Sequence, residues 1–303
     1  GMCSAIDALV DRHDVIVYDA ECHACIIDGV RLHSGKRFVY QHNNMLGLEK
    51  QLGRAEKLLS KNNGCILVIT EGVFGMSGDL GKLNKIALLK KKYNFRLFVD
   101  DAHGFGTIGD KGIGTGEYLD CQNEVDILFC TFAKSMSSIG AFISSTSDMV
   151  DYLRYNIRSQ IFAKSLPMPI VVGVIKRLEL LINKPELRKK LWQITNALQK
   201  GLKENGFSLG NTESAVTPIY LSGNVTEAAN LTYDLRENFG IFCSIVTYPV
   251  VAKNIILLRL IPTATHTLED VKYTINAFKS IKDKLTNGEY ISESLLDIYN
   301  KDL

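Results

Sequence analysis

The chain alternates short, mostly apolar runs with longer segments in which apolar positions recur every three or four residues. Apolar runs of strand length occupy residues 15–18, 38–40, 65–70, 97–100, 125–129 and 141–144. Between two of these runs, residues 83–93 place Ile86, Leu89 and Tyr93 at roughly helical spacing. Continuous apolar strands that alternate with helices predict an α/β fold whose mostly parallel central sheet carries helices on both faces.

The second half of the chain has a different texture. Long helical patterns run from about residue 147 to 206, and they are followed by strand-like runs at 216–221, 241–247 and 254–260. A helix over 268–285 and a short terminal helix over 288–303 complete the pattern. The expected organisation is a large domain over residues 1–160 and a smaller α+β domain over residues 161–303.

Composition narrows the class of protein. With 303 residues, of which 46% are hydrophobic and 22% charged, the chain can bury a core without disulfides or a structural metal. A net charge of +2 gives no electrostatic case for a nucleic-acid partner. We expect no membrane span, because no apolar run reaches the length that crosses a bilayer. Seven scattered cysteines favour a reducing, cytoplasmic location.

Two familiar signatures are incomplete. The glycines at 104, 106 and 109 have the spacing of a dinucleotide-binding loop, but more glycines follow at once, which predicts an irregular loop rather than a helix start. Cys22 and Cys25 flank His23 like half of a zinc site, yet the sequence has no second cluster of ligands. We therefore expect neither a nicotinamide cofactor nor a metal.

A third set of residues follows three predicted strands. His23 comes after the first strand, Asp100 and His103 close the fourth, and Thr131 and Lys134 come after the fifth. Ligands of open α/β sheets bind outside the carboxyl ends of the strands, where all of these residues would lie. A lysine can form a Schiff base with a carbonyl cofactor, and a carboxylate can keep a pyridine nitrogen protonated. The set therefore predicts chemistry with pyridoxal 5′-phosphate.

These motifs, in this order, resemble the α-oxoamine synthases, a family of pyridoxal phosphate-dependent acyltransferases of fold type I, the aspartate aminotransferase type. The resemblance rests on residues 21–29, 42–44, 70–79, 99–104, 131–135 and 258–267. Within the family, the chain is most similar to bacterial serine palmitoyltransferases. The 8-amino-7-oxononanoate synthases and 2-amino-3-ketobutyrate CoA ligases share the cofactor motifs, so sphingolipid and biotin biosynthesis both stay open.

The resemblance implies a role for each matching residue. Lys134 would bind the cofactor and move protons at the substrate α-carbon. Asp100 would pair with the pyridine nitrogen, His23 would stack on the ring, and His103 would hydrogen-bond the ring hydroxyl. Thr131 would contact the phosphate. The implied reaction condenses an amino acid, with serine favoured, with a fatty acyl-CoA and releases carbon dioxide, in a homodimer.

The resemblance also implies roles for residues near the two ends of the chain. Arg259 would receive the substrate carboxylate, and Gly1 and Met2 would belong to a turn whose amides hold the phosphate. On this alignment the chain begins inside the fold, without the family's N-terminal segment.

Hydroxyl groups that are usual in the family are missing from this sequence at Gly75, Ala133 and Ala163. Their loss would weaken phosphate binding. Two alternatives therefore stand beside the synthase. One is a truncated, catalytically weak or inactive homologue, and the other is an aminotransferase or lyase that does not use coenzyme A.

Overall fold

The computed structural model describes residues 1–60, 63–248 and 250–291. The chain forms two compact units. We call them the N-terminal unit (Gly1–Gly75 and Leu80–Pro185) and the C-terminal unit (Met76–Asp79 and Glu186–Leu303). The units divide after Pro185, whereas the boundary predicted from the sequence follows residue 160. Among the described helices, none combines the length and apolarity needed to cross a bilayer.

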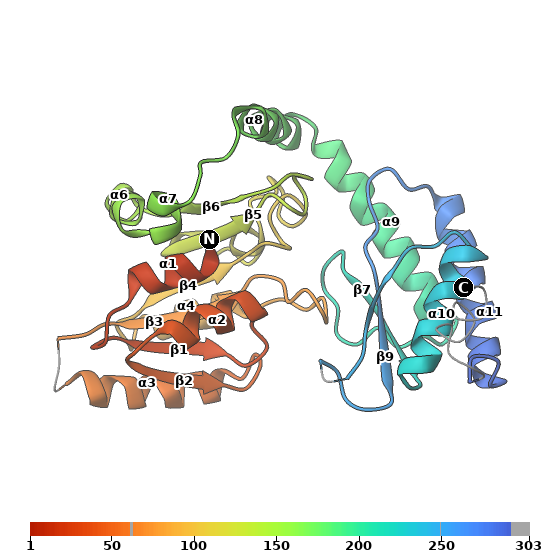
Figure 1. The fold of residues 1–303 in the computed structure, drawn as a ribbon, viewed down its shortest axis with the longest axis horizontal. Helices are drawn as coiled ribbons and strands as arrows, with labels where there is room; N and C mark the ends of the chain where they lie inside the picture. The colour runs from red at the N-terminus through yellow and green to blue at the C-terminus, as the bar shows by residue number, and fades with distance from the viewer. Residues whose placement is uncertain (61–62, 249, 292–303) are drawn as a thin grey trace. The chain divides into compact units, whose positions relative to one another are not determined.

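The N-terminal unit is built on a sheet of six described strands in the order β2-β1-β3-β4-β5-β6 (Figure 1). The strands are β1 (Val15–Asp19), β2 (Lys36–Tyr40), β3 (Ile66–Glu71), β4 (Arg96–Asp100), β5 (Ile127–Thr131) and β6 (Ala141–Ser144). The first five are parallel, and β6 runs antiparallel to β5 at the edge. The predicted mostly parallel sheet is therefore confirmed, and each strand lies within two residues of its predicted apolar run.

Both faces of this sheet are covered. The helices of the unit are α1 (Met2–Leu9), α2 (Ala24–Leu32), α3 (Met45–Leu59), α4 (Leu83–Leu89), α5 (Thr115–Tyr118), α6 (Ser147–Asn156), α7 (Arg158–Phe162) and α8 (Met168–Asn183), with a 3₁₀ turn η1 (Gln122–Glu124). Buried residues of α1 and α2 pack with Ile69 and Phe98 on one face. Buried residues of α3 and α4 pack with Val68 and Val99 on the other. Burial on two faces explains why the middle positions of the central strands β1, β3, β4 and β5 are apolar.

One predicted helix is shorter in the structure. The pattern over 83–93 forms α4 only as far as Leu89. The next three amides, from Lys90 to Lys92, bond to carbonyls three residues back, so the chain tightens into turns there.

The C-terminal unit has a three-stranded antiparallel sheet in the order β7-β9-β8, with helices beside it. Its elements are α9 (Pro185–Glu204), β7 (Thr217–Ser222), α10 (Val225–Glu237), β8 (Ser244–Val246), β9 (Ile255–Leu260) and α11 (Leu268–Thr286). The predicted strand over 241–247 shortens to β8 because the Ile241 N–H instead closes the end of α10, on the Leu235 carbonyl. Most of the terminal helix predicted over 288–303 lies outside the described residues.

Candidate active site

Four neighbouring parallel strands end at the same edge of the large sheet. In the order β1-β3-β4-β5, their carboxyl ends carry the turn to His23 and the residues Glu71, Asp100 and Thr131. Glu71 and Asp100 follow Ile69 and Phe98 by two positions, so they project to the face that α1 and α2 cover. The structure thus brings together polar groups from four separate stretches of sequence.

Asp100 is a buried carboxylate with capacity for a ligand. Its side chain is 5% exposed. Among the described residues, it accepts one hydrogen bond, from the Ala102 N–H to Oδ1 at 3.0 Å. Burial raises the pKa of Asp100, while the Ala102 N–H and the charge of Lys134 act to lower it. A cationic N–H that approached Oδ2 would find a charged, desolvated acceptor.

His23 is held by its own helix. It is the N-cap of α2, and its Nδ1 accepts the Cys25 backbone N–H at 3.2 Å. Because a backbone amide can only donate, Nδ1 carries no proton in this arrangement, and the neutral ring is protonated at Nε2. The Cys25 thiol lies 3.0 Å from the same Nδ1. The main-chain N–H of His23 donates to Oε1 of Glu71.

His103 packs on a glycine. A Cβ at Gly75 would lie 2.3 Å from Nε2 of the His103 ring. The hydroxyl that is usual in the family at Gly75 would require a side chain, and a side chain there would displace this imidazole. The His103 carbonyl accepts the Thr107 hydroxyl at 2.8 Å, which fixes the turn that carries the ring.

The turn after β5 presents Lys134. The Thr131 hydroxyl donates to the Gly140 carbonyl at 3.2 Å and accepts the Ala133 N–H at 3.1 Å. Lys134 is exposed, and its charge acts to lower the pKa values of both Asp100 and Glu71. The turn therefore places Lys134 close enough for its charge to act on both buried carboxyls.

The N-terminus of α1 lies beside the same strand. Gly1 caps the helix, Met2 is buried, and a Cβ at Gly1 would be 3.6 Å from the Phe129 ring of β5. The amides of a first helical turn suit an anion such as phosphate. Ala163, by contrast, is exposed at the end of α7, where nothing in the structure assigns it a role.

Arg259 belongs to the C-terminal unit. It lies on β9, and its Nε donates to the Ser244 hydroxyl of β8 at 3.1 Å. Burial lowers the pKa of its guanidinium. Within its own unit, Arg259 is a half-buried cation held in a fixed orientation.

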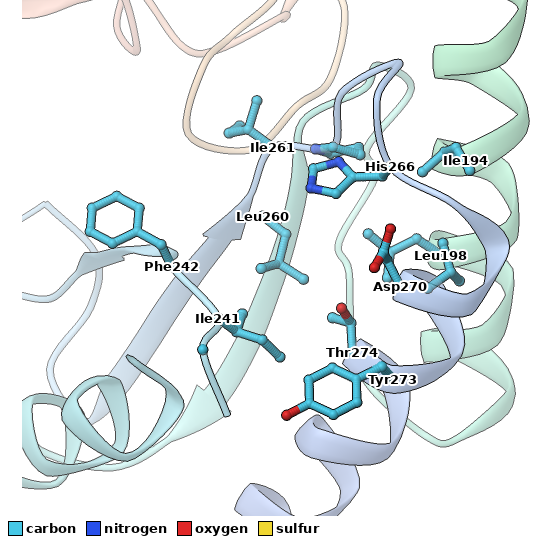
Figure 2. Close-up of a pocket in the computed structure, with 13 residues that line it drawn as sticks. Ile194, Leu198, Ile241, Phe242, Leu260, Ile261, His266, Asp270, Tyr273 and Thr274 are labelled. Carbon is cyan, nitrogen blue, oxygen red and sulfur yellow. The ribbon is translucent and has the colours of Figure 1, made fainter. Parts of the chain in front are cut away.

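The C-terminal unit also contains a hollow of about 410 Å³ between α9, α11 and the strands (Figure 2). Its walls are largely apolar, and its polar side chains are engaged inside the unit. His266 Nδ1 accepts the Thr263 N–H at 2.9 Å, Asp270 takes part in the cap of α11, and the Tyr273 hydroxyl donates to the Phe239 carbonyl at 3.0 Å. None of the residues assigned to the reaction lines it.

Glu71 is the residue of the site that sequence reasoning missed. It is 5% exposed, and burial and the negative charge of Asp100 raise its pKa to about 8. The available signal was an acidic residue at the end of an otherwise apolar run, 65–70. Ionisable groups whose pKa values are shifted in this way concentrate at functional sites.

Comparison with known proteins agrees with this geometry. The family described as "Aminotransferase class I and II" matches residues 2–278. The cysteate-C-fatty acyltransferase of Capnocytophaga ochracea is 59% identical over 290 residues, which cover 96% of this chain and 69% of that protein. The serine palmitoyltransferase of Bacteroides thetaiotaomicron is 38% identical over 280 residues, covering 91% and 69%.

A solved structure gives the same fold. The serine palmitoyltransferase of S. paucimobilis, with bound pyridoxal phosphate and myriocin, superposes with a TM-score of 0.87 at 28% identity, over 94% of this chain and 71% of that one. The cofactor of the present chain is pyridoxal phosphate, and its residues fit that group. Asp100 is a buried carboxylate of the kind that would suit a protonated ring nitrogen, and Lys134 supplies a primary amine of the kind that would suit the aldehyde.

Proposed function

Because the chain belongs to the aminotransferase class I and II family, we propose that it is an α-oxoamine synthase that condenses an amino acid with a fatty acyl-CoA and releases carbon dioxide. The observation that carries the proposal is that the buried Asp100 carboxylate, at the end of β4, lies within electrostatic reach of Lys134, which follows the adjacent strand β5. The fatty acyltransferases among its relatives support the reaction class.

In this proposal, each residue of the site acts on a particular atom of the cofactor or the substrate. Bound pyridoxal phosphate supplies the electron sink for the substrate α-carbon. We assign the ring nitrogen to the Asp100 carboxylate, which keeps it protonated. His23 stacks on the ring and presents Nε2–H to the substrate, and the Lys134 amine removes and returns the α-proton. His103 hydrogen-bonds the ring hydroxyl.

The anionic groups have separate partners in this proposal. The Thr131 hydroxyl and the amides that follow Gly1 and Met2 hold the phosphate. Arg259 receives the substrate carboxylate, for which its planar fork is suited.

Cysteate is the amino acid we propose first, because the relative at 59% identity is a cysteate-C-fatty acyltransferase. Serine, which the sequence resemblance favours, is the second candidate and is supported by the relative at 38% identity. The two substrates differ in charge, since a sulfonate is ionised at every working pH. Added salt should therefore weaken the binding of cysteate more than that of serine.

The test measures coenzyme A released from palmitoyl-CoA with cysteate or with serine, and identifies the product by mass spectrometry. We expect a kcat/KM for cysteate at least about tenfold above that for serine, which corresponds to about 1.4 kcal/mol of discrimination. A preference for serine would transfer the assignment to serine. Release with neither amino acid, by protein that holds the cofactor, would refute the acyl transfer and favour the weak or inactive homologue.

We also propose a homodimer in the cytoplasm. None of the 16 residues of α8, all of them described, is buried, although Val172, Ile175 and Ile182 are each more than half exposed. An apolar helix of this kind fits an interface between two copies. The seven cysteines are all free, which suits a reducing compartment. Light scattering should give twice 33.7 kDa, and Ile175→Asp should reduce that mass to one copy.

A further inference from the structure

Glu71 and Asp100 form a pair of buried carboxyls at the centre of the candidate site. They are register partners on the adjacent parallel strands β3 and β4, and each is 5% exposed. Both project to the sheet face where α2 begins. Two carboxylates so placed cannot both ionise without a large cost, because little solvent separates their charges.

The surroundings decide which member of the pair keeps the proton. The titratable groups that act on Glu71 or respond to it come from β1, the start of α2, β4 and the turn after β5. They are Asp19, Cys22, His23, Cys25, Asp100 and Lys134. Burial and the Asp100 charge raise the pKa of Glu71 to about 8, against the lowering effects of the His23 N–H and of Lys134.

Glu71 also positions the His23 backbone through a hydrogen bond that does not require Glu71 to be ionised. Its Oε1 accepts the main-chain N–H of His23, the residue that caps α2. A carboxylic acid can accept this bond at its carbonyl oxygen while the other oxygen carries the proton. Asp100, in contrast, has to be ionised to attract a protonated ring nitrogen.

We propose that Glu71 is a positioning residue that carries the proton of the Glu71–Asp100 pair, so that Asp100 is its single negative charge, and that it fixes the His23 backbone at the start of α2. The assignment rests on the proposed function for the role of Asp100 toward the cofactor. The protonation state itself is a property of this chain without any ligand.

The experiment reads the protonated acid directly in the cofactor-free protein. Infrared spectra of wild type, Glu71→Gln and Glu56→Gln are recorded from pH 7 to pH 10, and the carbonyl band of a buried protonated carboxyl is followed. The range begins at pH 7 because burial raises the pKa of Asp101 to about 6, so that this second buried carboxyl is largely ionised there. We expect the band in wild type at pH 7, its loss around pH 8, and its absence from Glu71→Gln. Glu56 is exposed on α3, so the same substitution there should leave the band intact. A wild-type spectrum at pH 7 without the band overturns the proposal even if Glu71→Gln does not fold.

Cofactor affinity tests the second half of the proposal. Glutamine is neutral and retains a carbonyl acceptor for the His23 N–H, so Glu71→Gln should bind pyridoxal phosphate within about threefold of wild type at pH 7. Glu71→Leu is neutral but lacks the acceptor, and it should bind at least about tenfold more weakly, which equals 1.4 kcal/mol. Equal affinity of the two variants would refute the role in holding His23. Wild type that binds no cofactor, but shows the infrared band, would refute the proposed function and leave the protonation assignment standing.

Discussion

Substitution of Gly104 by alanine should disrupt the turn that follows Asp100. A Cβ at Gly104 would lie 2.1 Å from Asp101 Oδ1 and 2.8 Å from the Thr115 hydroxyl, so the carboxylate has to move. Asp101 is 1% exposed and accepts the Thr115 N–H at 2.6 Å and the Thr115 hydroxyl at 2.9 Å. Each hydrogen bond to a charged group is worth about 1.5–3 kcal/mol, so loss of both costs about 3 kcal/mol or more.

Urea denaturation followed by far-UV circular dichroism measures this cost, with Gly53→Ala as the control. Gly53 lies inside α3, and a Cβ there would meet only the Tyr93 hydroxyl, at 3.8 Å. The control should be unchanged or more stable by about 0.5–1 kcal/mol, because alanine suits a helix interior better than glycine. Because Gly104 adjoins His103, Gly104→Ala should also weaken retention of the cofactor. Equal stability of the two variants would refute the argument that the Asp101 carboxylate fills the space beside Gly104.

Three further outcomes follow from the site and the caps. Lys134→Ala should fold, by circular dichroism, but lose the visible absorbance band of the lysine-bound cofactor; an unchanged band would place the attachment elsewhere. Glu71 has a raised pKa in the folded state, so its proton is lost more readily on unfolding, and stability should fall as pH rises from about 5 to 8, by up to about 1.4 kcal/mol per pH unit. Glu71→Gln should remove that slope in urea titrations. Thr267→Ala should lower the free energy of unfolding by about 1 kcal/mol, because it removes the side-chain oxygen that accepts the Asp270 N–H at the start of α11. Thermal denaturation at an unchanged midpoint would show that this cap does not stabilise the fold.

The sequence predicts the central strands of the large sheet well because burial on both faces keeps their middle positions apolar. β3 is the clearest case, since all six of its residues are buried. The same logic fails where a backbone bond competes with strand pairing. Ile241 is apolar and follows the strand pattern, yet its N–H donates to a carbonyl at the end of α10. The spacing of hydrophobic residues does not predict this hydrogen bond.

The residues of the candidate site also differ in how far the sequence predicts them. His23, Asp100 and Lys134 follow predicted strands, so their position at the carboxyl edge is open to sequence reasoning. The role of Glu71 cannot be predicted from the sequence in the same way. It depends on β3 and β4 being neighbours in register and on the Asp100 side chain projecting to the same face of the sheet. Strand order is set by how the connecting segments cross the faces of the sheet, which a single sequence does not display. An acidic residue that ends a buried strand is ambiguous by itself, and it becomes a proton-bearing partner only once a second carboxyl is known to lie beside it.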